Sequence, residues 1–230
     1  WKESTNMEMD QIDEHNTFED LGENGVPPAG FKRMTGHLVH DVKHDGRHKA
    51  RFVADGHRTP VPVDSACSSV ASLRGIRMVM FIAELNGLDL WATDIGNAHL
   101  ESYTKEKLCI IAGPEFGDGE GHVMTVRKAS YGLRTSGQCW HERFADVLLQ
   151  EGFFPCKNEP DIWMRDRGDH CEHVAVHVDD LIVASRSPKA SQDMLEIKHK
   201  FKTKGTGPAS FHLGCDFFRD EDGVLCMAPR

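Results

Sequence analysis

Residues 174–185 read VAVHVDDLIVAS, in which two apolar runs flank the adjacent acids Asp179 and Asp180. Runs rich in β-branched residues on both sides of a short polar pair are typical of two strands joined by a hairpin turn. Neighbouring carboxylates repel each other at neutral pH unless a cation lies close to them. On these residues alone the turn is either an ordinary exposed Asp-rich turn or a binding site for a divalent cation.

A third acid, Asp94, ends the strand-like stretch LDLWATD (88–94) and precedes Ile95 and Gly96. Magnesium prefers oxygen ligands and takes some of them from water and substrate phosphates, so a few carboxylates suffice to hold it. Two such ions can activate an attacking hydroxyl and stabilise the leaving oxygen in phosphoryl transfer. The pattern therefore predicts that Asp94, Asp179 and Asp180 are catalytic metal ligands for two Mg²⁺ ions, with Mn²⁺ as a substitute. Gly96 would let a triphosphate approach the backbone closely.

Five segments, in this order, resemble the reverse transcriptase of copia-type LTR retrotransposons. They are KARFVADG (49–56), DIGNAHLE (94–101), YGLR (131–134) followed by Trp140, HVDD (177–180) and FHLGC (211–215). The resemblance covers nearly the whole chain. It implies an RNA-directed DNA polymerase, a nucleotidyltransferase in which the primer 3′-hydroxyl attacks the α-phosphate of an incoming deoxynucleotide.

The resemblance also implies which residues bind the nucleotide: Lys49 and Arg51 on the triphosphate side, and Ile95, Gly96 and His99 near the acids. His99 stands where the family usually has Phe or Tyr, at a position that screens the sugar 2′ position. Further departures occur at Asp55, where Arg is frequent, at Thr135, where Gln is often found, and at His177, which replaces Tyr. None removes a metal ligand. A catalytically inactive, retroelement-derived nucleic-acid-binding domain is the alternative, and a metal-dependent nuclease fits the acids but not the order of the motifs.

The periodicity of apolar residues predicts an α+β domain. Three helices are expected. The first contains Val70, Leu73, Ile76, Met80 and Ala83, with Asp64 or Ser65 as N-cap and Gly87 at its end. The second runs from about Gly137 to Glu151, with Trp140, Phe144, Val147 and Leu148 on its buried face and Gly152 as its stop. The third starts at Ser187-Pro188, with Met194, Leu195 and Phe201 facing inward. Two hairpins, 161–178 and the acidic one, complete an antiparallel sheet with helices packed on one face.

Together with the resemblance, this order predicts the fingers and palm of a right-hand polymerase with the thumb largely absent. We expect fingers over 1–69, with an acidic arm at 1–25, and again over 102–136. The palm is expected over 70–101 and over 137–230, which includes the catalytic hairpin. The chain is expected to be part of a longer polyprotein, with integrase upstream and RNase H downstream.

The net charge of −9 is unevenly distributed. Residues 1–25 carry −7 of it, whereas residues 32–51 carry a local +4 and lysines alternate over 198–204. Basic clusters are often solvated surface, but here they suit the phosphates of a primed RNA or DNA template and of deoxynucleoside triphosphates. No run approaches the ~18 apolar residues of a membrane span, so no membrane partner is expected.

Seven cysteines without a Cys-x-x-Cys spacing indicate a reduced, intracellular setting. The resemblance implies a cytoplasmic particle, the nucleus or both. His170, Cys171, His173 and His177 raise the alternative of a zinc site. Their spacing lacks a second matching ligand pair, so zinc is not favoured.

Overall fold

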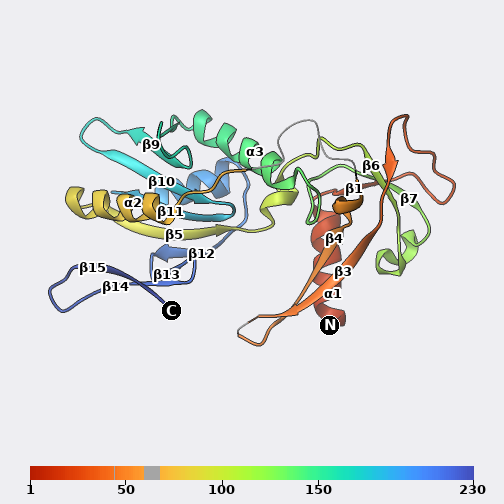
Figure 1. Cartoon of the computed structure of the whole chain (residues 1–230), viewed down its shortest axis with the longest axis horizontal. Coiled ribbons are helices and arrows are strands. Elements are labelled where there is room, and N and C mark those ends of the chain that lie inside the picture. The colour runs from red at the N-terminus through yellow and green to blue at the C-terminus, as the bar shows by residue number, and fades with distance from the viewer. Residues whose placement is uncertain (44, 60–67) are drawn as a thin grey trace. The chain divides into compact units, whose positions relative to one another are not determined.

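The computed structural model describes residues 1–43, 45–59 and 68–230, and the chain is a mixed α+β protein. It divides into two compact units (Figure 1). Unit 1 comprises Trp1–Ser68 and His99–Arg143, and unit 2 comprises Ser69–Ala98 and Phe144–Arg230. Within the described part of the chain, no helix is both long and apolar enough to cross a membrane.

Unit 1 contains a mixed sheet and a long hairpin that share one core. The sheet has the order β1-β7-β6-β2, and the hairpin pairs β3 with β4 in antiparallel register. Met9 and Ile12 of the first helix are buried in this core with Phe52, Leu108 and other apolar side chains. The elements are α1 (Lys2–Glu14), β1 (Phe18–Asp20), β2 (Lys32–Arg33), β3 (Gly36–Val42), β4 (His48–Ala54), β6 (Leu108–Ile111) and β7 (Val123–Val126), with short 3₁₀ turns η1 (Gly56–Arg58), η2 (Ala98–Glu101) and η3 (Pro114–Gly119).

Unit 2 is built on an antiparallel sheet of order β12-β5-β11-β10-β9-β8. A smaller antiparallel sheet, β13-β14-β15, follows it in the chain. Both hairpins expected from the sequence are confirmed as β9-β10 and β10-β11. The strands are β5 (Asp89–Ile95), β8 (Phe154–Pro155), β9 (Ile162–Asp166), β10 (Cys171–His177), β11 (Asp180–Ser185), β12 (Thr203–Pro208), β13 (Phe211–His212), β14 (Cys215–Arg219) and β15 (Leu225–Pro229).

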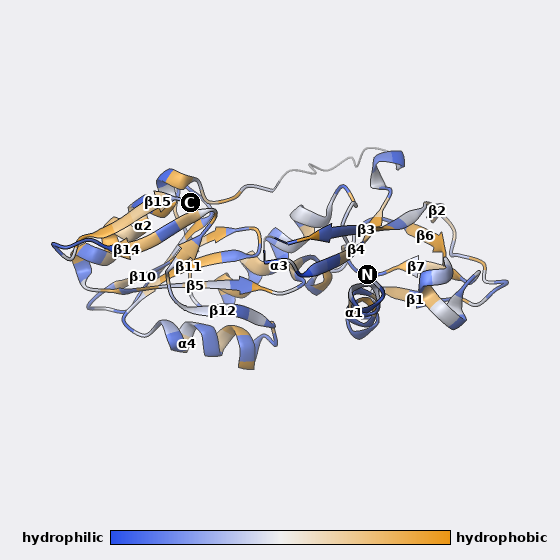
Figure 2. Cartoon of the chain, turned by 90° about the horizontal axis from the view of Figure 1, so that it is seen from below, coloured by the Kyte–Doolittle hydropathy of each residue, from blue (hydrophilic) through white to orange (hydrophobic). Residues whose placement is uncertain are grey.

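Helices cover both faces of the larger sheet, which corrects the expectation of helices on one face. Figure 2 shows α2 (Leu73–Asn86) and α4 (Pro188–Asp193) on opposite sides of β5 and β11. Strand β11 is covered on both sides, because Leu181 and Ile182 point to opposite faces of the sheet and both side chains are fully buried. The apolar runs around the acidic pair are continuous, rather than alternating, because both faces of this strand are covered.

The first expected helix is shorter than predicted. Helix α2 begins after Ser72, whose Oγ accepts a hydrogen bond from Gly75 N–H at 3.0 Å, as an N-cap does. The predicted caps, Asp64 and Ser65, lie outside the described residues. The end is as predicted, because Gly87 has a left-handed φ of 58°.

The other two helices agree with the sequence pattern. Helix α3 (Ser136–Gln150) ends before Gly152, and its predicted apolar face is buried. Pro188 is the first residue of α4, which continues into one π turn, η4 (Met194–Lys198), and Leu195 and Phe201 are buried while Met194 is partly exposed. On the α3 face, the exposed fractions of the side chains are 0–2%: Trp140, Phe144, Val147 and Leu148.

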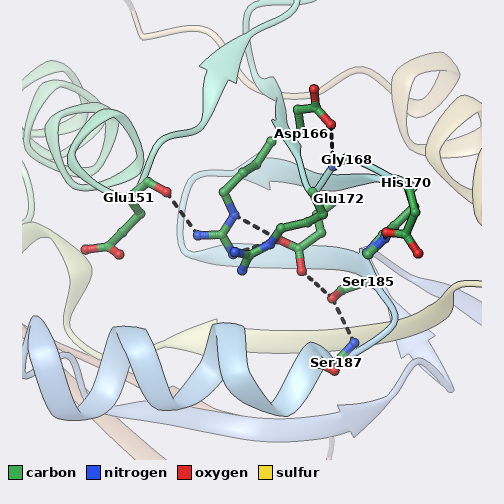
Figure 3. Close-up of polar contacts among 10 residues, drawn as sticks. Glu151, Asp166, Gly168, His170, Glu172, Ser185 and Ser187 are labelled. Carbon is green, nitrogen blue, oxygen red and sulfur yellow. Dashed lines mark hydrogen bonds and ion pairs between the residues drawn. The ribbon is translucent and has the colours of Figure 1, made fainter.

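A buried polar cluster joins β9, β10 and β11 at the end of the hairpin away from the acidic turn (Figure 3). The Glu172 carboxylate accepts hydrogen bonds from Ser185 Oγ at 2.7 Å and from Arg165 and Arg167 Nε at 2.8 Å each. Arg165 also donates to the carbonyl of Glu151 at the end of α3, at 3.0 Å. The cluster therefore fixes the distal ends of three strands with a carboxylate whose charge is compensated.

Candidate functional site

Strand pairing brings the predicted catalytic acids to one end of the sheet in unit 2. Asp94 on β5 and Asp180 on β11 are direct partners in the antiparallel register, so their side chains share one face. Asp179 precedes Asp180 in the turn between β10 and β11, where His177 pairs with Asp180. The alternation of the two strands thus places a carboxylate from each at neighbouring positions, as the sequence pattern predicts.

The hairpin turn has a backbone conformation that its sequence does not favour. Val178 has a φ of 59°, in the left-handed region that β-branched residues rarely adopt. Two-residue hairpins with a positive φ at their first position usually place Gly there. The carbonyl of the next residue, Asp179, accepts a hydrogen bond from Ile95 N–H at 2.8 Å. This bond fixes the turn over the end of β5, and Ile95 itself has a fully buried side chain.

The electrostatics of the acidic end favour a cation. Burial raises the pKa of Asp180 to about 6, and the negative charges of Asp179 and Asp94 add to the rise. The two neighbouring carboxylates thus make ionisation of Asp180 less favourable. A bound cation would remove this repulsion, because it interacts favourably with all three charges.

Lys204 was not predicted as part of the site. It lies on β12 directly across from Asp94, which therefore has Asp180 as its partner on one side and Lys204 on the other. A Cβ placed on Gly96 would lie 3.1 Å from the Lys204 Nζ, and Gly96 N–H donates to the Lys202 carbonyl at 2.7 Å. Gly96 therefore leaves room for a lysine side chain. The alternating lysines over 198–204 were the only feature of the sequence that pointed to Lys204. That their strand pairs with β5 could not be predicted from the sequence.

Among the described residues, no group of three or more His, Cys, Asp or Glu side chains has the geometry to hold a metal ion, which applies to the acids and to the zinc alternative. The donor set of the acidic end nevertheless suits Mg²⁺ in its chemistry, since it consists of carboxylate oxygens. Metal binding by Asp94, Asp179 and Asp180 stays a prediction.

Of the residues predicted for the nucleotide, Arg51 and His99 contact Tyr131 in unit 1, whereas Ile95 and Gly96 belong to unit 2. The guanidinium carbon of Arg51 lies 5.3 Å from the centre of the Tyr131 ring, and the His99 ring meets the same ring edge-on at 5.2 Å. Lys49 and Arg51 are on the same face of β4, since they are two residues apart on the strand. Arg51 Nε is buried and has no hydrogen-bond acceptor within the described residues. Tyr131 belongs to a recognised motif, but its contact with both residues was not predicted.

The residues that depart from the family pattern have local partners. Thr135 donates to Glu106 Oε1 through its backbone N–H at 3.2 Å and through its hydroxyl at 2.8 Å. Asp55 accepts a hydrogen bond from Thr35 and lies 3.1 Å from His37 Nδ1. His177 Nδ1 lies 3.3 Å from the carbonyl of Ala71. Each of the three side chains therefore has a structural role in its own unit.

Comparisons with known proteins agree with the resemblance read from the motifs. The family model described as "Reverse transcriptase (RNA-dependent DNA polymerase)" matches residues 25–228. The chain is 26% identical over 189 residues to the "Retrovirus-related Pol polyprotein from transposon RE1" of Arabidopsis thaliana, covering 80% of this chain and 13% of that protein. It is 28% identical over 171 residues to the "Transposon Ty1-DR4 Gag-Pol polyprotein" of Saccharomyces cerevisiae, covering 73% of this chain and 10% of that protein.

The chain thus spans roughly an eighth of the length of the RE1 polyprotein and a tenth of the length of the Ty1-DR4 polyprotein, whereas the family model covers most of the chain itself. All five motifs fall within the matched residues. On this evidence the chain belongs to the reverse transcriptase (RNA-dependent DNA polymerase) family, and its relatives are copia-type retrotransposon polyproteins.

Proposed function

We propose that this chain is the fingers and palm of an RNA-directed DNA polymerase that extends a primer by two-metal nucleotidyl transfer. The observation that carries the proposal is the register of β5 and β11, which pairs Asp94 with Asp180 beside Asp179. In a member of this family, that pairing is the arrangement that a polymerase needs at its catalytic end.

The division into units supports the assignment of subdomains. Unit 2 holds the sheet with the acidic hairpin and corresponds to the proposed palm, expected over 70–101 and 137–230. Unit 1 holds the β3-β4 hairpin with Lys49 and Arg51 and corresponds to the proposed fingers. The strands β13 to β15, which follow the palm sheet directly in the chain, are assigned to the palm as well.

Asp94, Asp179 and Asp180 would hold two Mg²⁺ ions, with Mn²⁺ as a substitute. The ions would supply activation of the primer 3′-hydroxyl and neutralisation of charge on the phosphate. The protein would contribute the fixed spacing of the carboxylates: β5 holds Asp94, and the strained turn at Val178 holds the other two. Lys204, across from Asp94, would place one positive charge beside the acids from the other side.

The nucleotide would contact Lys49 and Arg51 through its triphosphate. Arg51 has a buried Nε–H without an acceptor in the described residues, and a phosphate oxygen would satisfy it. His99 would lie near the sugar, and Gly96 near the backbone side of the site. An imidazole is smaller than the Phe or Tyr ring usual at this position, so we propose weaker exclusion of the 2′-hydroxyl.

The proposed partners follow from this assignment. They are an RNA or DNA template with its primer, deoxynucleoside triphosphates, and the rest of a polyprotein with integrase upstream and RNase H downstream. The proposed setting is intracellular, in a cytoplasmic particle or the nucleus. The −7 charge of residues 1–25 would keep nucleic acid away from α1 and direct it to the basic stretches.

Primer extension on an RNA template with purified protein tests the proposal. We expect incorporation of deoxynucleotides that requires Mg²⁺ or Mn²⁺ and is lost in Asp94→Asn. The matched control is Asp89→Asn, which lies on the same strand at its exposed far end and should behave as wild type. Template binding without extension, with or without the downstream segment restored, would favour the inactive nucleic-acid-binding alternative. Cleavage of the template strand would favour a nuclease.

A further inference from the structure

Helix α1 precedes residues 25–228, which the family model matches, yet it contributes to the core of unit 1. The side of the helix that faces the core carries Thr5, Glu8, Met9 and Ile12, which recur at helical spacing, and Trp1 precedes the helix as its N-cap residue. Figure 1 shows α1 alongside β3 and β4. The Trp1 ring stacks on His48 at 4.1 Å, and Thr5 Oγ1 lies 3.0 Å from His40 Nε2. The helix therefore follows the hairpin along its length.

The side of β4 that faces away from β3 has no strand partner, because the described sheet contains β3 and β4 alone. Two of its outward N–H groups are nevertheless bonded. Phe52 N–H donates to Glu8 Oε1 at 3.0 Å, and Ala54 N–H donates to the carbonyl of Tyr131 at 2.8 Å. Glu8 is thus a side-chain acceptor for the open edge of the strand, at the residue next to Arg51.

The same carboxylate lies in the field of the two basic residues of β4. Burial raises the pKa of Glu8, whereas the Phe52 N–H and the charges of Lys49 and Arg51 act in the opposite direction. An apolar residue at position 8 would leave the Phe52 N–H without its acceptor. The acidic helix therefore makes one specific contact with the strand, beyond its general negative charge.

We propose that Glu8 is a positioning residue for β4: its carboxylate closes the open edge of the strand at Phe52 and so holds Lys49 and Arg51 in place to bind a triphosphate. This inference rests on the proposed function, because it takes β4 as the triphosphate-binding strand. Glu8 does not touch the nucleotide itself. It acts through the backbone of the strand whose side chains do.

The test measures two quantities separately in the full chain: the protection of the Phe52 amide at the edge of β4, and the affinity for a triphosphate. Hydrogen exchange of the Phe52 amide, followed by NMR, reports the edge. Inorganic tripolyphosphate, followed through the NMR signal of Arg51 Nε–H, reports binding and needs no polymerase activity. The variants are Glu8→Ala, which removes the acceptor, and Glu8→Gln, which keeps an acceptor oxygen but removes the charge. Asp10→Asn is the matched control, on the exposed face of α1.

For Glu8→Ala we expect exchange at Phe52 to rise at least about tenfold and tripolyphosphate to bind at least about fivefold more weakly. The reason is that the loss of this partly buried hydrogen bond costs about 1.4 kcal/mol, which is a factor of ten. Exchange at Ala54 should stay at the wild-type rate, which shows that the unit is folded. Glu8→Gln should keep wild-type exchange and bind tripolyphosphate as tightly as wild type or somewhat more tightly. Asp10→Asn should match wild type in both.

Unchanged Phe52 exchange in Glu8→Ala would overturn the inference, as would tighter tripolyphosphate binding in Glu8→Ala, which would mean that only the charge of Glu8 acts. Absence of a response at Arg51 in the wild type would overturn it as well. Failure of primer extension with intact tripolyphosphate binding would count against the proposed function alone.

Discussion

At one end of the β10-β11 hairpin Glu172 accepts hydrogen bonds from Ser185, Arg165 and Arg167, whereas at the other end Asp180 faces the carboxylates of Asp179 and Asp94. Burial alone would raise the pKa of Glu172, but the hydrogen bonds from Ser185 and Arg165, with the charge of Arg165, outweigh it, and the pKa is lowered. At Asp180 burial and like charges act together, and the pKa rises to about 6.

The difference separates a carboxylate that stabilises the fold from one that is suited to bind a ligand. Both are carried by the same pair of strands, a few residues apart. A carboxylate whose charge is already paired and hydrogen-bonded inside the protein is not available to bind a cation. A carboxylate placed beside other carboxylates destabilises the fold unless a cation binds there. Such uncompensated negative charge is what a functional metal site requires. The comparison leads to four predictions and one decisive measurement.

The largest effect is expected for Asp180→Asn. Primer extension should fall at least about 1,000-fold, or about 4 kcal/mol in transition-state stabilisation, because a metal ligand is lost. The free energy of unfolding should rise by about 1–2 kcal/mol after allowance for solvent screening, because the raised pKa of Asp180 reflects burial of its charge and repulsion by Asp179 and Asp94, and Asn relieves both. Urea denaturation without metal measures the second quantity. A variant that is both active and less stable would contradict the comparison.

The opposite pattern is expected for Glu172→Gln. The change leaves the largely buried Arg165 without its counter-charge, so the free energy of unfolding should fall by about 3 kcal/mol. Primer extension by the folded fraction should stay within about threefold of wild type, since the cluster lies at the far end of the strands. Asp169→Asn, which changes an exposed acid in the turn between β9 and β10, is the control and should change stability little. A loss of activity without loss of stability would place Glu172 in the catalytic site instead.

The stabilisation by Glu172 should depend on pH in a defined direction. Its pKa is lower in the folded chain than the ordinary value of 4.5, so the folded state binds this proton less readily than the unfolded chain does. The contribution is therefore present in full above about pH 4.5 and is lost as the pH falls through the folded pKa. Urea denaturation at several pH values should show the gap between wild type and Glu172→Gln narrowing below pH 4.5. If the difference in free energy of unfolding between wild type and Glu172→Gln stays constant over this pH range, the charge of Glu172 is not the cause of that difference.

The smallest effect is expected for Val178→Gly in the acidic turn. Gly accepts the φ of 59° without strain, so the free energy of unfolding should rise by up to about 1 kcal/mol despite the greater flexibility of the unfolded chain. Primer extension should fall by about fivefold to tenfold, because the turn holds Asp179 and Asp180 less firmly. Val178→Ala is the control, since it keeps the strain. Equal loss of stability in both variants would show that the turn is not strained.

Much of the sheet could be predicted from local pattern. The apolar runs around Asp179 and Asp180 and the Gly at the ends of α2 and α3 each determine structure within a few residues, and these predictions are confirmed. The start of α2 could not be placed, because Ser72 is only one of several polar residues before Leu73 that fit an N-cap. Helices on both faces of the sheet were missed, because burial of Leu181 and Ile182 on opposite faces depends on what packs there.

Individual sequence motifs predicted part of the candidate site. Asp94 and Asp180 could be named from their settings, and the resemblance added Arg51 and His99. The contacts of Tyr131, Lys204 and Glu8 could not be predicted, because each joins residues far apart in the sequence through a pairing that only the folded chain defines. The pairing of Glu172 with Arg165 and Arg167 could not be predicted for the same reason, because it depends on β9 lying beside β10 in the folded chain.

Paramagnetic broadening by Mn²⁺ tests the central claim most directly, because it compares the two ends of the hairpin in one experiment and does not depend on a thumb. Backbone amide NMR signals would be followed while Mn²⁺ is added to the full chain, with Asp180→Asn as the control. The proposed metal site predicts selective broadening at Ile95, Asp179 and Asp180, none at Glu172 or Ser185, and loss of the effect in Asp180→Asn. Broadening centred on Glu172, or no selective broadening at the acidic turn, would contradict it.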